Sequence, residues 1–362
     1  MQEGRARYSS QAMTQKIPVG VLGATGAVGQ RFIQLLADHP WFEVAELLAS
    51  DRSAGKSYRE ACVWRLATPL PERVASMTVR GPEDALSSPI QFSGLDSSVA
   101  GELEARLSTR GHAVVSNARN HRMADDVPLL IPEVNPDHLD ALAVQRKRTG
   151  GGYIVTNPNC SVVGLAMALA PLHRTFGLES AVVVTLQALS GAGYPGVASL
   201  DAIDNVIPYI GGGEEEKIEA EPRKILGRFA GGAFTLADFT VSASVHRVAV
   251  SDGHTMAIFA RLRSKASAAD AKRALADFRG EPQEKRLPTA PRAPIHVHDA
   301  PDRPQPRLDR DREGGMAVSV GRVREDGLFH LKLEALVHNT IRGAAGVAIL
   351  NAELLRERGL LP

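Results

Sequence analysis

The feature that most constrains the fold is a glycine turn that joins an apolar run to an amphipathic segment near the N-terminus. Residues 17–22 form the apolar run, and the turn that follows, residues 23–29, reads GATGAVG. Apolar residues then recur at helical spacing at Val28, Phe32 and Leu35. This pattern predicts a strand, a tight turn and a helix, which together open an α/β fold.

Strand and helix patterns continue to alternate through the first half of the chain. We expect further strands within 42–50, 89–95 and 113–120, and a helix that ends near residue 110. Strands that alternate with helices indicate a doubly wound parallel sheet of the Rossmann type.

Longer strand-like runs dominate after residue 180. They occupy four ranges, 181–190, 240–250, 253–262 and 328–339. Their length and wide spacing indicate a large mixed or antiparallel sheet, so we expect an α+β second domain. The segment around 288–312 is rich in proline and charge and is expected to be a surface loop.

Composition narrows the kind of partner. The formal net charge is only +1, and no apolar run approaches the roughly 18 residues of a membrane span. We therefore expect a small-molecule partner, with neither nucleic acid nor membrane, and a cytoplasmic location. The chain has two cysteines, which makes a disulfide framework or a cysteine-based zinc site improbable, and we expect no metal.

The glycine turn is a candidate phosphate-binding site. Glycines let the backbone approach a pyrophosphate at the helix N-terminus, where free N–H groups favour anions. A plain strand-to-helix turn is the alternative. The candidate cofactor contacts in the turn are Gly23, Thr25, Gly26, Ala27, Val28 and Gly29.

The end of the second strand indicates which dinucleotide binds. NAD sites usually place an acidic residue there, whereas NADP sites offer arginine and hydroxyl groups to the 2′-phosphate. Ser50, Arg52 and Ser53 therefore favour NADP, although Asp51 lies in the same stretch. A polar surface loop is the alternative interpretation.

These patterns suggest a division of the chain into three parts. We expect a loose N-terminal extension at 1–15 and an NADP-binding domain formed by 16–158 and 339–362. The second domain then occupies 159–338. The C-terminal segment is rich in glycine and alanine. Small residues suit close packing, so we expect this segment to return to the first domain.

Cys160 lies between an Asn-Pro-Asn turn and the start of an apolar helical pattern. A thiolate at a helix N-terminus is stabilised by the helix dipole and by nearby N–H groups, so we expect a lowered pKa. This favours a nucleophile over a buried, inert thiol. Cys62, flanked by apolar residues, fits the inert alternative better.

A reactive thiolate needs an acid or base beside it, and two histidines are candidates. His246 and His254 both lie in the segment SVHRVAVSDGHT, and spacing alone does not choose between them. Arg247 is a candidate carboxylate clamp because guanidinium groups bind carboxylates in bidentate geometry. The run of three glutamates before Lys217 is either a binding cluster or a solvated helix start.

Seven strings together resemble the aspartate-β-semialdehyde dehydrogenase family, in its archaeal and fungal-type branch. They are GATGAVGQRFI, SNARNHRM, NPNCSVVGL, QALSGAGYPG, GGEEEKI, SVHRVAVSDGHT and HNTIRGAAGVAILNAE. They run from about residue 17 to residue 355 in the family's order. Serine and valine follow the cysteine where two hydroxyl residues are common in the family.

The resemblance implies catalytic roles for three residues. Cys160 would be the nucleophile that forms an acyl-thioester, Gln187 would orient the substrate, and His254 would be the acid–base residue. The reaction implied is the NADPH-dependent reductive dephosphorylation of L-aspartyl-4-phosphate to L-aspartate-4-semialdehyde. It serves the biosynthesis of lysine, methionine, threonine and isoleucine.

The resemblance also implies binding roles. Arg247 would bind the substrate α-carboxylate, and Glu215, or Glu214 one position earlier, would bind its ammonium group. The remaining implied contacts are Arg122, Lys217 and Asn117 for phosphate, and Ser190, Gly191 and Asn339 for the nicotinamide. A homodimer or homotetramer, assembled through the second sheet, is implied as well.

Three alternatives remain open. A coenzyme-A-dependent acyl reductase, such as a malonyl-coenzyme A reductase, would keep Cys160, His254 and the NADP site but change the acid-binding pocket. An N-acetyl-glutamyl-phosphate reductase is a weaker alternative because an acetylated amine needs no Glu215. A non-catalytic nucleotide-binding homologue would not need both the thiol and the imidazole.

Overall fold

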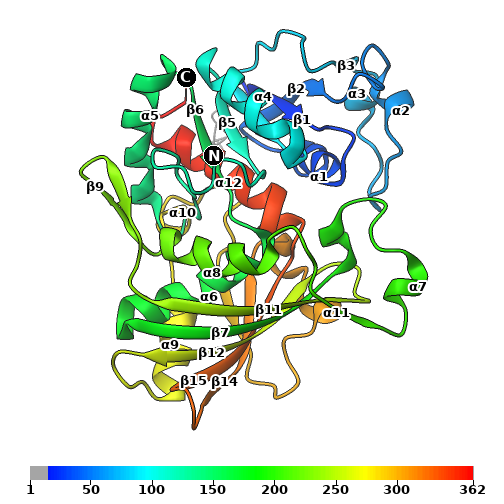
Figure 1. Cartoon of the computed structure of the whole chain (residues 1–362). Coiled ribbons are helices and arrows are strands. Elements are labelled where there is room, and N and C mark those ends of the chain that lie inside the picture. The colour runs from blue at the N-terminus through cyan, green and yellow to red at the C-terminus, as the bar shows by residue number, and fades with distance from the viewer. Residues whose placement is uncertain (1–14, 362) are drawn as a thin grey trace, which may run out of the picture.

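The computed structural model describes residues 15–361, so the expected N-terminal extension lies outside the described residues except for residue 15. Two sheets stack one above the other, and helices lie between them (Figure 1). Two hydrophobic clusters pack on the first sheet, a large one and a smaller one that includes Leu103 and Leu107, and a third cluster packs on the other sheet. The arrangement places the helices between the sheets at the junction of the two halves.

The first sheet has six strands in the order β3-β2-β1-β4-β5-β6, and every pair is parallel. This order confirms the predicted doubly wound sheet. Its strands are β1 (Ile17–Leu22), β2 (Phe42–Leu48), β3 (Val79–Arg80), β4 (Ile90–Ser93), β5 (Ala113–Ser116) and β6 (Tyr153–Thr156). Its longer helices are α1 (Ala27–Leu36), α4 (Ser97–Thr109) and α5 (Leu142–Thr149). The chain order reverses between β1 and β4, and ligands of such sheets bind at that point, beyond the carboxyl ends of the strands.

The second sheet has seven strands in the order β13-β14-β15-β12-β7-β11-β8. β7 pairs with β11 in parallel and with β12 antiparallel, which confirms the predicted mixed sheet. Its first strands are β7 (Leu178–Gln187), β8 (Val206–Pro208), β11 (Thr240–Val248) and β12 (His254–Leu262). The others are β13 (Ile295–Val297), β14 (Val318–Glu325) and β15 (Leu331–Val337).

Helix α6 (Cys160–Phe176) joins the two halves of the molecule. It begins four residues after β6 and packs against β12 and β15, and residues 161–172 are all buried. Helix α8 (Glu214–Ile225) packs against both α6 and β11 (Figure 1). The apolar sequence of α6 is therefore explained by burial on every side.

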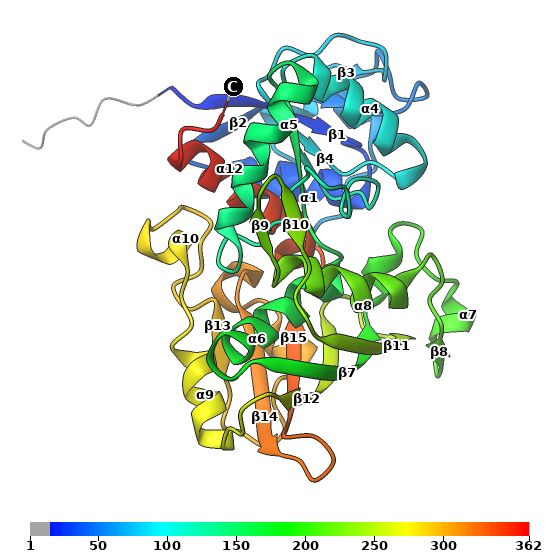
Figure 2. The ribbon, with the colours of Figure 1, turned by 60° about the vertical axis from the view of Figure 1, so that its left-hand side comes forward.

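Several short elements complete the fold. The helices are α2 (Tyr58–Ala61), α3 (Glu72–Ala75), α7 (Ser199–Ala202), α9 (Ala268–Ala276) and α10 (Glu281–Glu284). Short 3-10 helices occupy Pro136–Ala141, Leu189–Ala192 and Arg312–Gly315. The hairpin of β9 (Arg228–Ala230) and β10 (Ala233–Thr235) reaches from the mixed-sheet half to the first of these 3-10 helices (Figure 2).

The proline-rich segment is more ordered than predicted. It contains β13, which pairs with β14, and the short helix α11 (Pro306–Asp309). Asp309 is buried and accepts hydrogen bonds from Arg303 Nε at 2.6 Å and from the Gln305 amide at 2.8 Å. The prediction of a surface loop was wrong because a buried carboxylate network leaves no periodic apolar signal in the sequence.

The C-terminal segment starts with a π-helical turn, Ile341–Ala345, before α12 (Gly346–Glu357) begins. α12 packs against α1, β4 and β5. In the π-helical turn, Arg342 is fully buried and binds Glu133 through two hydrogen bonds of 2.7 and 3.0 Å. The sequence did not predict this turn, because glycine and alanine alone do not indicate a π-helical turn.

Candidate active site

Cys160 is the first residue of α6, directly after the N-cap residue Asn159. The Asn159 side chain accepts hydrogen bonds from the backbone amides of Ser161, at 2.9 Å, and Val162, at 3.4 Å. Asparagine is among the preferred N-cap residues because its oxygen binds amides that have no partner within the helix. The helix therefore starts where the sequence predicted, with the thiol in its first turn.

The Cys160 thiol contacts the imidazole of His254. The distance from Sγ to Nε2 is 3.2 Å. The backbone amide of Ala188 donates to the other ring nitrogen, Nδ1, at 3.0 Å. A backbone amide can only donate, so Nδ1 is unprotonated and the ring proton lies on Nε2, facing the sulfur.

The His254 ring is neutral at physiological pH. Burial, followed by the positive charge of Arg247, lowers its pKa to about 3. The other candidate, His246, hydrogen bonds through Nδ1 to the carbonyl of Thr185 at 3.3 Å. Because successive side chains of a strand point to opposite faces, His246 and Arg247 cannot both face the thiol. The structure brings His254 to Cys160, and His246 lies elsewhere.

The expected lowering of the Cys160 pKa is not found. Burial, followed by the Glu214 carboxylate, raises the pKa of this thiol to about 12. Three cations act in the opposite direction, namely Arg122, Lys217 and Arg247. The sequence argument considered only the helix N-terminus and could not include a buried carboxylate nearby. In the free protein the thiol form therefore dominates.

Glu214 is the glutamate of the run that enters the site. Its carboxylate binds Lys217 Nζ at 2.6 Å and accepts hydrogen bonds from Asn159 Nδ2 at 2.9 Å and Gln187 Nε2 at 3.1 Å. Although burial opposes it, the Lys217 charge and these bonds lower the pKa of Glu214. Glu215 instead accepts from the backbone amide of Val245 on β11. The structure therefore brings Glu214, and not Glu215, to the thiol.

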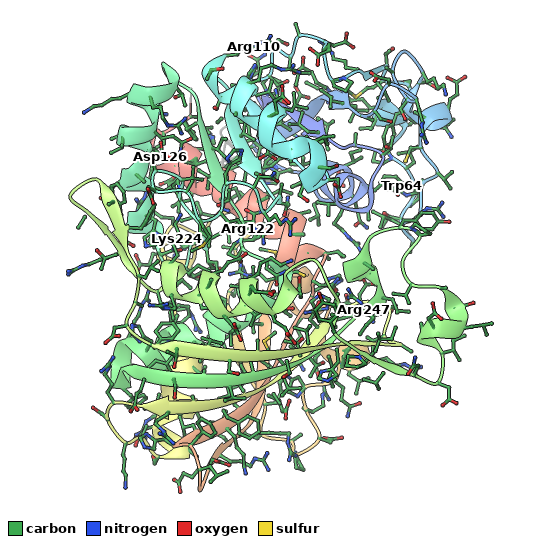
Figure 3. All side chains as sticks on the ribbon, viewed as in Figure 1. Trp64, Arg110, Arg122, Asp126, Lys224 and Arg247 are labelled. Atoms are coloured by element: carbon green, nitrogen blue, oxygen red, sulfur yellow. The ribbon has the colours of Figure 1, made fainter. Side chains whose placement is uncertain are left out.

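Arg247 is the second-last residue of β11 (Figure 3). It is 5% exposed, and its Nη1 donates to the carbonyl of Ala188 at 2.7 Å. Gly191 lies directly against Arg247 and His254. A Cβ atom on Gly191 would lie 2.8 Å from Arg247 Nη1 and 3.0 Å from His254 Cε1. Only glycine lets the backbone approach this closely.

Arg122 is a further cation whose charge acts on the thiol. Its Nη1 donates to Glu221 at 2.8 Å and its Nη2 donates to the carbonyl of Asn117 at 2.7 Å. The Asn117 amide is itself engaged, because it donates to the Ser93 carbonyl and accepts from Asn157. The structure thus brings Arg122 to the site, while the Asn117 side chain supports the surrounding loop.

The glycine turn borders a cavity of about 810 Å³. A Cβ atom on Gly29 would lie 2.2 Å from the Gly23 carbonyl oxygen, so the close approach of turn and helix requires glycine there. The N-cap residue of α1 offers no side-chain cap, so its first amides stay available to an anion. The cavity lining includes Gly23, Thr25, Gly26, Ala27, Val28, Ser50, Asp51 and Arg106.

Two of the residues predicted to recognise NADP do not line this cavity. Arg52 is exposed and Ser53 is buried, whereas Ser50 and Asp51 are part of the lining. Arg106 also lines it, and its guanidinium binds Glu83 at 3.0 Å. Arg106 lies in the helix after β4. The sequence prediction of NADP contacts considered only the end of the second strand and therefore did not include Arg106.

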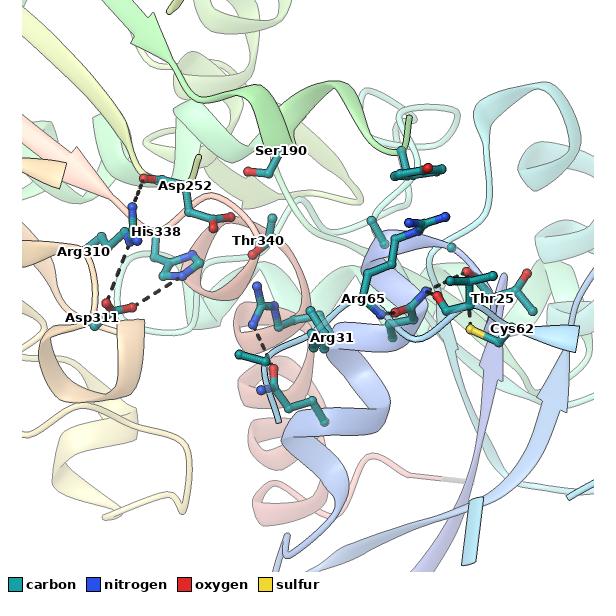
Figure 4. A pocket seen from close by; sticks show the side chains of 18 of the residues that line it. Thr25, Arg31, Cys62, Arg65, Ser190, Asp252, Arg310, Asp311, His338 and Thr340 are labelled. Atoms are coloured by element: carbon teal, nitrogen blue, oxygen red, sulfur yellow. Dashed lines mark hydrogen bonds and ion pairs between the residues drawn. The ribbon is translucent and has the colours of Figure 1, made fainter. Parts of the chain in front are cut away.

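A second cavity, of about 670 Å³, shares Thr25, Gly26 and Ala27 with the first and extends to Ser190 and Thr340 (Figure 4). Asn339 Nδ2 donates to Ser190 Oγ at 2.8 Å, and its Oδ1 accepts from the Gly253 amide at 2.8 Å. The structure therefore brings the predicted nicotinamide residues together, close to the start of β12 and to His254.

Sequence reasoning missed three groups at the site. They are the Asn159 side chain, the Glu221 carboxylate and the Ala188 amide. The spacing of charged residues could have indicated Glu221, because it lies seven residues after Glu214 and four after Lys217, on the same face of the helix. Among residues 15–361, no cluster of His, Cys, Asp or Glu is arranged to hold a metal ion. In the same range, no helix is long and apolar enough to span a membrane.

Together, the glycine turn of a Rossmann-type sheet and a thiol–imidazole pair at the junction of two sheets define a class of nicotinamide-dependent dehydrogenases with an active-site cysteine. Residues 18–142 match the family described as semialdehyde dehydrogenase, NAD binding domain, and residues 169–342 match its dimerisation domain. The chain belongs to the aspartate-semialdehyde dehydrogenase family.

Individual relatives cover almost the whole chain. The aspartate-semialdehyde dehydrogenase of Archaeoglobus fulgidus is 51% identical over 93% of this chain and 97% of its own length. That of Schizosaccharomyces pombe is 48% identical over 95% and 99%. The crystal structure of the Candida albicans enzyme with NADP has a TM-score of 0.88 at 45% identity, covering 96% of this chain and all of that one.

A more distant solved structure extends the comparison to a substrate complex. Aspartate semialdehyde dehydrogenase II of Vibrio cholerae, complexed with ASA, has a TM-score of 0.75 at 28% identity. It covers 95% of this chain and 99% of its own. The two-sheet arrangement is thus shared well beyond the archaeal and fungal relatives.

Proposed function

We propose that this chain is an NADP-dependent aspartate-semialdehyde dehydrogenase. It converts L-aspartyl-4-phosphate to L-aspartate-4-semialdehyde in the biosynthesis of lysine, methionine, threonine and isoleucine. The observation that carries the proposal is the 3.2 Å contact between Cys160 and His254 in an enclosure that also holds Glu214 and Arg247. The substrate class is supported by relatives named aspartate-semialdehyde dehydrogenase, whose sequences are about 50% identical over nearly the full chain.

The charges around the thiol match the three charged groups of the substrate. Arg247 binds the α-carboxylate, because a guanidinium group offers paired donors to a carboxylate. Glu214 binds the ammonium group and Gln187, bonded to Glu214, orients it. The phosphate is received by Arg122 and Lys217. Each of these cations also has a carboxylate partner in the free protein, and the phosphate shares the cation with that carboxylate.

Substrate binding activates the nucleophile. The Glu214 carboxylate raises the pKa of Cys160, so a substrate ammonium group that pairs with Glu214 removes part of that effect. The thiol gives its proton to the substrate phosphate, the resulting thiolate attacks the acyl carbon, the sulfur–carbon bond forms, and the bond from carbon to the phosphate oxygen breaks. The product is a thioester on Cys160, and phosphate leaves towards Arg122.

His254 acts as a hydrogen-bond donor to the reacting atoms. Its Nε2 proton faces Sγ, so it stabilises first the thiolate and then the oxyanion at the reacting carbon. Full proton transfer, the role expected from the sequence, requires loss of the Ala188 hydrogen bond to Nδ1. When the oxyanion collapses, the carbon–sulfur bond breaks, and the aldehyde and the thiolate are released.

The residues of the glycine turn fit NADP. The close turn at Gly29 and the uncapped N-terminus of α1 provide a binding site for the pyrophosphate. Ser190 and Asn339 lie between this turn and His254. When bound, NADPH supplies the hydride that reduces the thioester carbon. Ser50 and Arg106 line the same cavity as the glycine turn and are the candidate groups for the 2′-phosphate.

We also propose the domain organisation and assembly. An NADP-binding domain comprises residues 16–158 and 339–362, and a catalytic and dimerisation domain comprises residues 159–338. The protein forms a homodimer or homotetramer through its mixed sheet and acts in the cytoplasm. The match to a family dimerisation domain over 169–342 and the exposed residues Thr240, Ser242 and Ser244 on β11 support the assembly surface.

The experiment that tests this function follows NADP reduction with L-aspartate-4-semialdehyde and phosphate. The proposal predicts that reduction requires both, and that coenzyme A cannot replace phosphate. The acetylated amino aldehyde should react at least about tenfold more slowly, because it cannot pair with Glu214. Turnover that depends on coenzyme A, or that does not need the free amine, would replace this proposal by an acyl reductase of another specificity.

A further inference from the structure

One face of α8 carries four charged residues, and only half of them are explained by substrate binding. The residues are Glu214, Lys217, Glu221 and Lys224, at spacings of three, four and three. Such spacings place side chains on the same face of a helix. Glu214 and Lys217 face the thiol, while Glu221 and Lys224 lie one and two turns further along and are almost fully buried.

The Glu221 carboxylate joins two elements of the site. One oxygen accepts from Arg122 Nη1 at 2.8 Å, and the other accepts from the backbone amide of Asn159 at 2.7 Å. In a capping box, a glutamate three residues after the N-cap binds this same amide. That position is Val162 here, so Glu221 supplies the missing acceptor from another helix.

Lys224 holds the segment that carries Arg122. Its Nζ donates to the carbonyls of Arg122, Ala124 and Val127 at 2.8, 2.7 and 2.9 Å. All three donor positions of the ammonium group are thereby used. Figure 3 shows Lys224 and Arg122 close together beside α8. Two residues of α8 therefore bind this segment. Lys224 binds its backbone, and Glu221 binds the guanidinium group of Arg122.

We propose that Glu221 is a positioning residue of the phosphate site. It fixes the guanidinium of Arg122 and the amide before Cys160 relative to each other, so that leaving group and nucleophile are aligned by one carboxylate. This inference deepens the proposed function and depends on it. Truncating one partner of a buried ion pair leaves the other charge uncompensated, so loss of Glu221 frees Arg122 to reorient.

The test compares two variants of the full-length enzyme that remove one carboxylate charge each from α8. In Glu221→Gln, one of the two acceptor oxygens becomes an NH2 group, which can only donate and therefore faces one of the two donors. In the control, Glu216→Gln, the altered side chain is exposed on the first turn of the same helix. We expect the KM for phosphate to rise about tenfold in Glu221→Gln, with the KM for the aldehyde within about twofold. Glu216→Gln should match wild type.

A second readout does not depend on turnover. Phosphate that binds the native state raises Tm, and this rise should be smaller in Glu221→Gln than in Glu216→Gln. If Glu221→Gln does not fold, Glu221→Asp, which keeps the charge but is too short to reach both donors, should show the same selective rise in phosphate KM.

The outcomes separate two failures. The inference is overturned if an active wild type and all Glu221 variants share one phosphate KM, or if the KM values for phosphate and aldehyde rise together. A wild type without phosphate-dependent turnover would instead refute the proposed function itself.

Discussion

The Sγ atom of Cys160 lies 3.2 Å from Nε2 of His254, while the other nitrogen of that ring is bound by the Ala188 amide. The imidazole is therefore neutral and points its only proton at the sulfur. A thiolate–imidazolium pair is not the resting state of this site. The ionisation of the thiol depends instead on the charges around it.

Replacement of His254 tests its role as a hydrogen-bond donor. Because burial and Arg247 lower the pKa of His254 to about 3, the ring carries no charge above pH 5. The pH profile of kcat/KM for the aldehyde in wild type should therefore show no ionisation between pH 6 and 7. His254→Asn should lower kcat about 100- to 1000-fold, the usual cost of a lost oxyanion donor. His246→Asn is the matched control, expected to keep activity within a few-fold. An ionisation near pH 6.5 in the wild-type pH profile would contradict a neutral His254.

Glu214→Gln should separate thiol reactivity from turnover. The Glu214 carboxylate raises the pKa of Cys160, so its removal lowers that pKa and increases the thiolate fraction at any pH below about 12. Alkylation of Cys160 by iodoacetamide should therefore be faster at pH 8 than in wild type. Turnover should fall, and the KM for the aldehyde should rise, because the ammonium group loses its partner. Slower alkylation in the variant would show that the Glu214 charge does not act on the thiol.

Gly191→Ala should disturb the site by crowding. The added Cβ would lie 2.8 Å from Arg247 Nη1 and 3.0 Å from the His254 ring, so both side chains must shift. A displacement of about 1 Å at a reacting centre can cost about 100-fold in rate, and we expect a loss of this order in kcat/KM. Gly327→Ala is the control, since nothing lies within 4 Å of its added Cβ. Equal activity of the two variants would mean that the Gly191 contact is not tight.

The fold and the location of the nucleophile could be predicted from local signals. The glycine turn and the alternation of strands and helices indicated the parallel sheet, and Asn159 before an apolar run indicated the start of α6. These features depend on residues close together in the chain. For that reason they can be read without knowledge of tertiary contacts.

The site depends on contacts between distant segments, which the sequence pattern does not contain. Three consecutive glutamates follow Gly213, and only the packing of α8 on β11 determines that Glu214 faces the thiol while Glu215 faces the backbone of Val245. The raised pKa of Cys160 has the same origin. One of its two causes, the Glu214 carboxylate, comes from a helix more than 50 residues away in sequence, and the other, burial, comes from the packing of distant segments around the thiol.

The buried pair of Arg342 and Glu133 should stabilise the turn next to the nucleophile. Both side chains are fully buried, and they share hydrogen bonds of 2.7 and 3.0 Å. Glu133→Gln leaves an uncompensated guanidinium, so we expect the free energy of unfolding to fall by about 3–5 kcal/mol in a urea titration. Glu72→Gln breaks an exposed pair with Arg59 and should cost less than about 1 kcal/mol. Similar losses in the two variants would contradict this assignment.

Trapping of the acyl-enzyme tests the central claim, that Cys160 is the nucleophile, most directly. Enzyme mixed with L-aspartate-4-semialdehyde and NADP, without phosphate, should form NADPH in a burst of about one equivalent per site and then stop. Mass spectrometry should find the aspartyl group on Cys160, with Cys62 unmodified, and phosphate should restore turnover. Cys160→Ala should give no burst. Sustained NADPH formation without phosphate, or a burst in Cys160→Ala, would contradict the account.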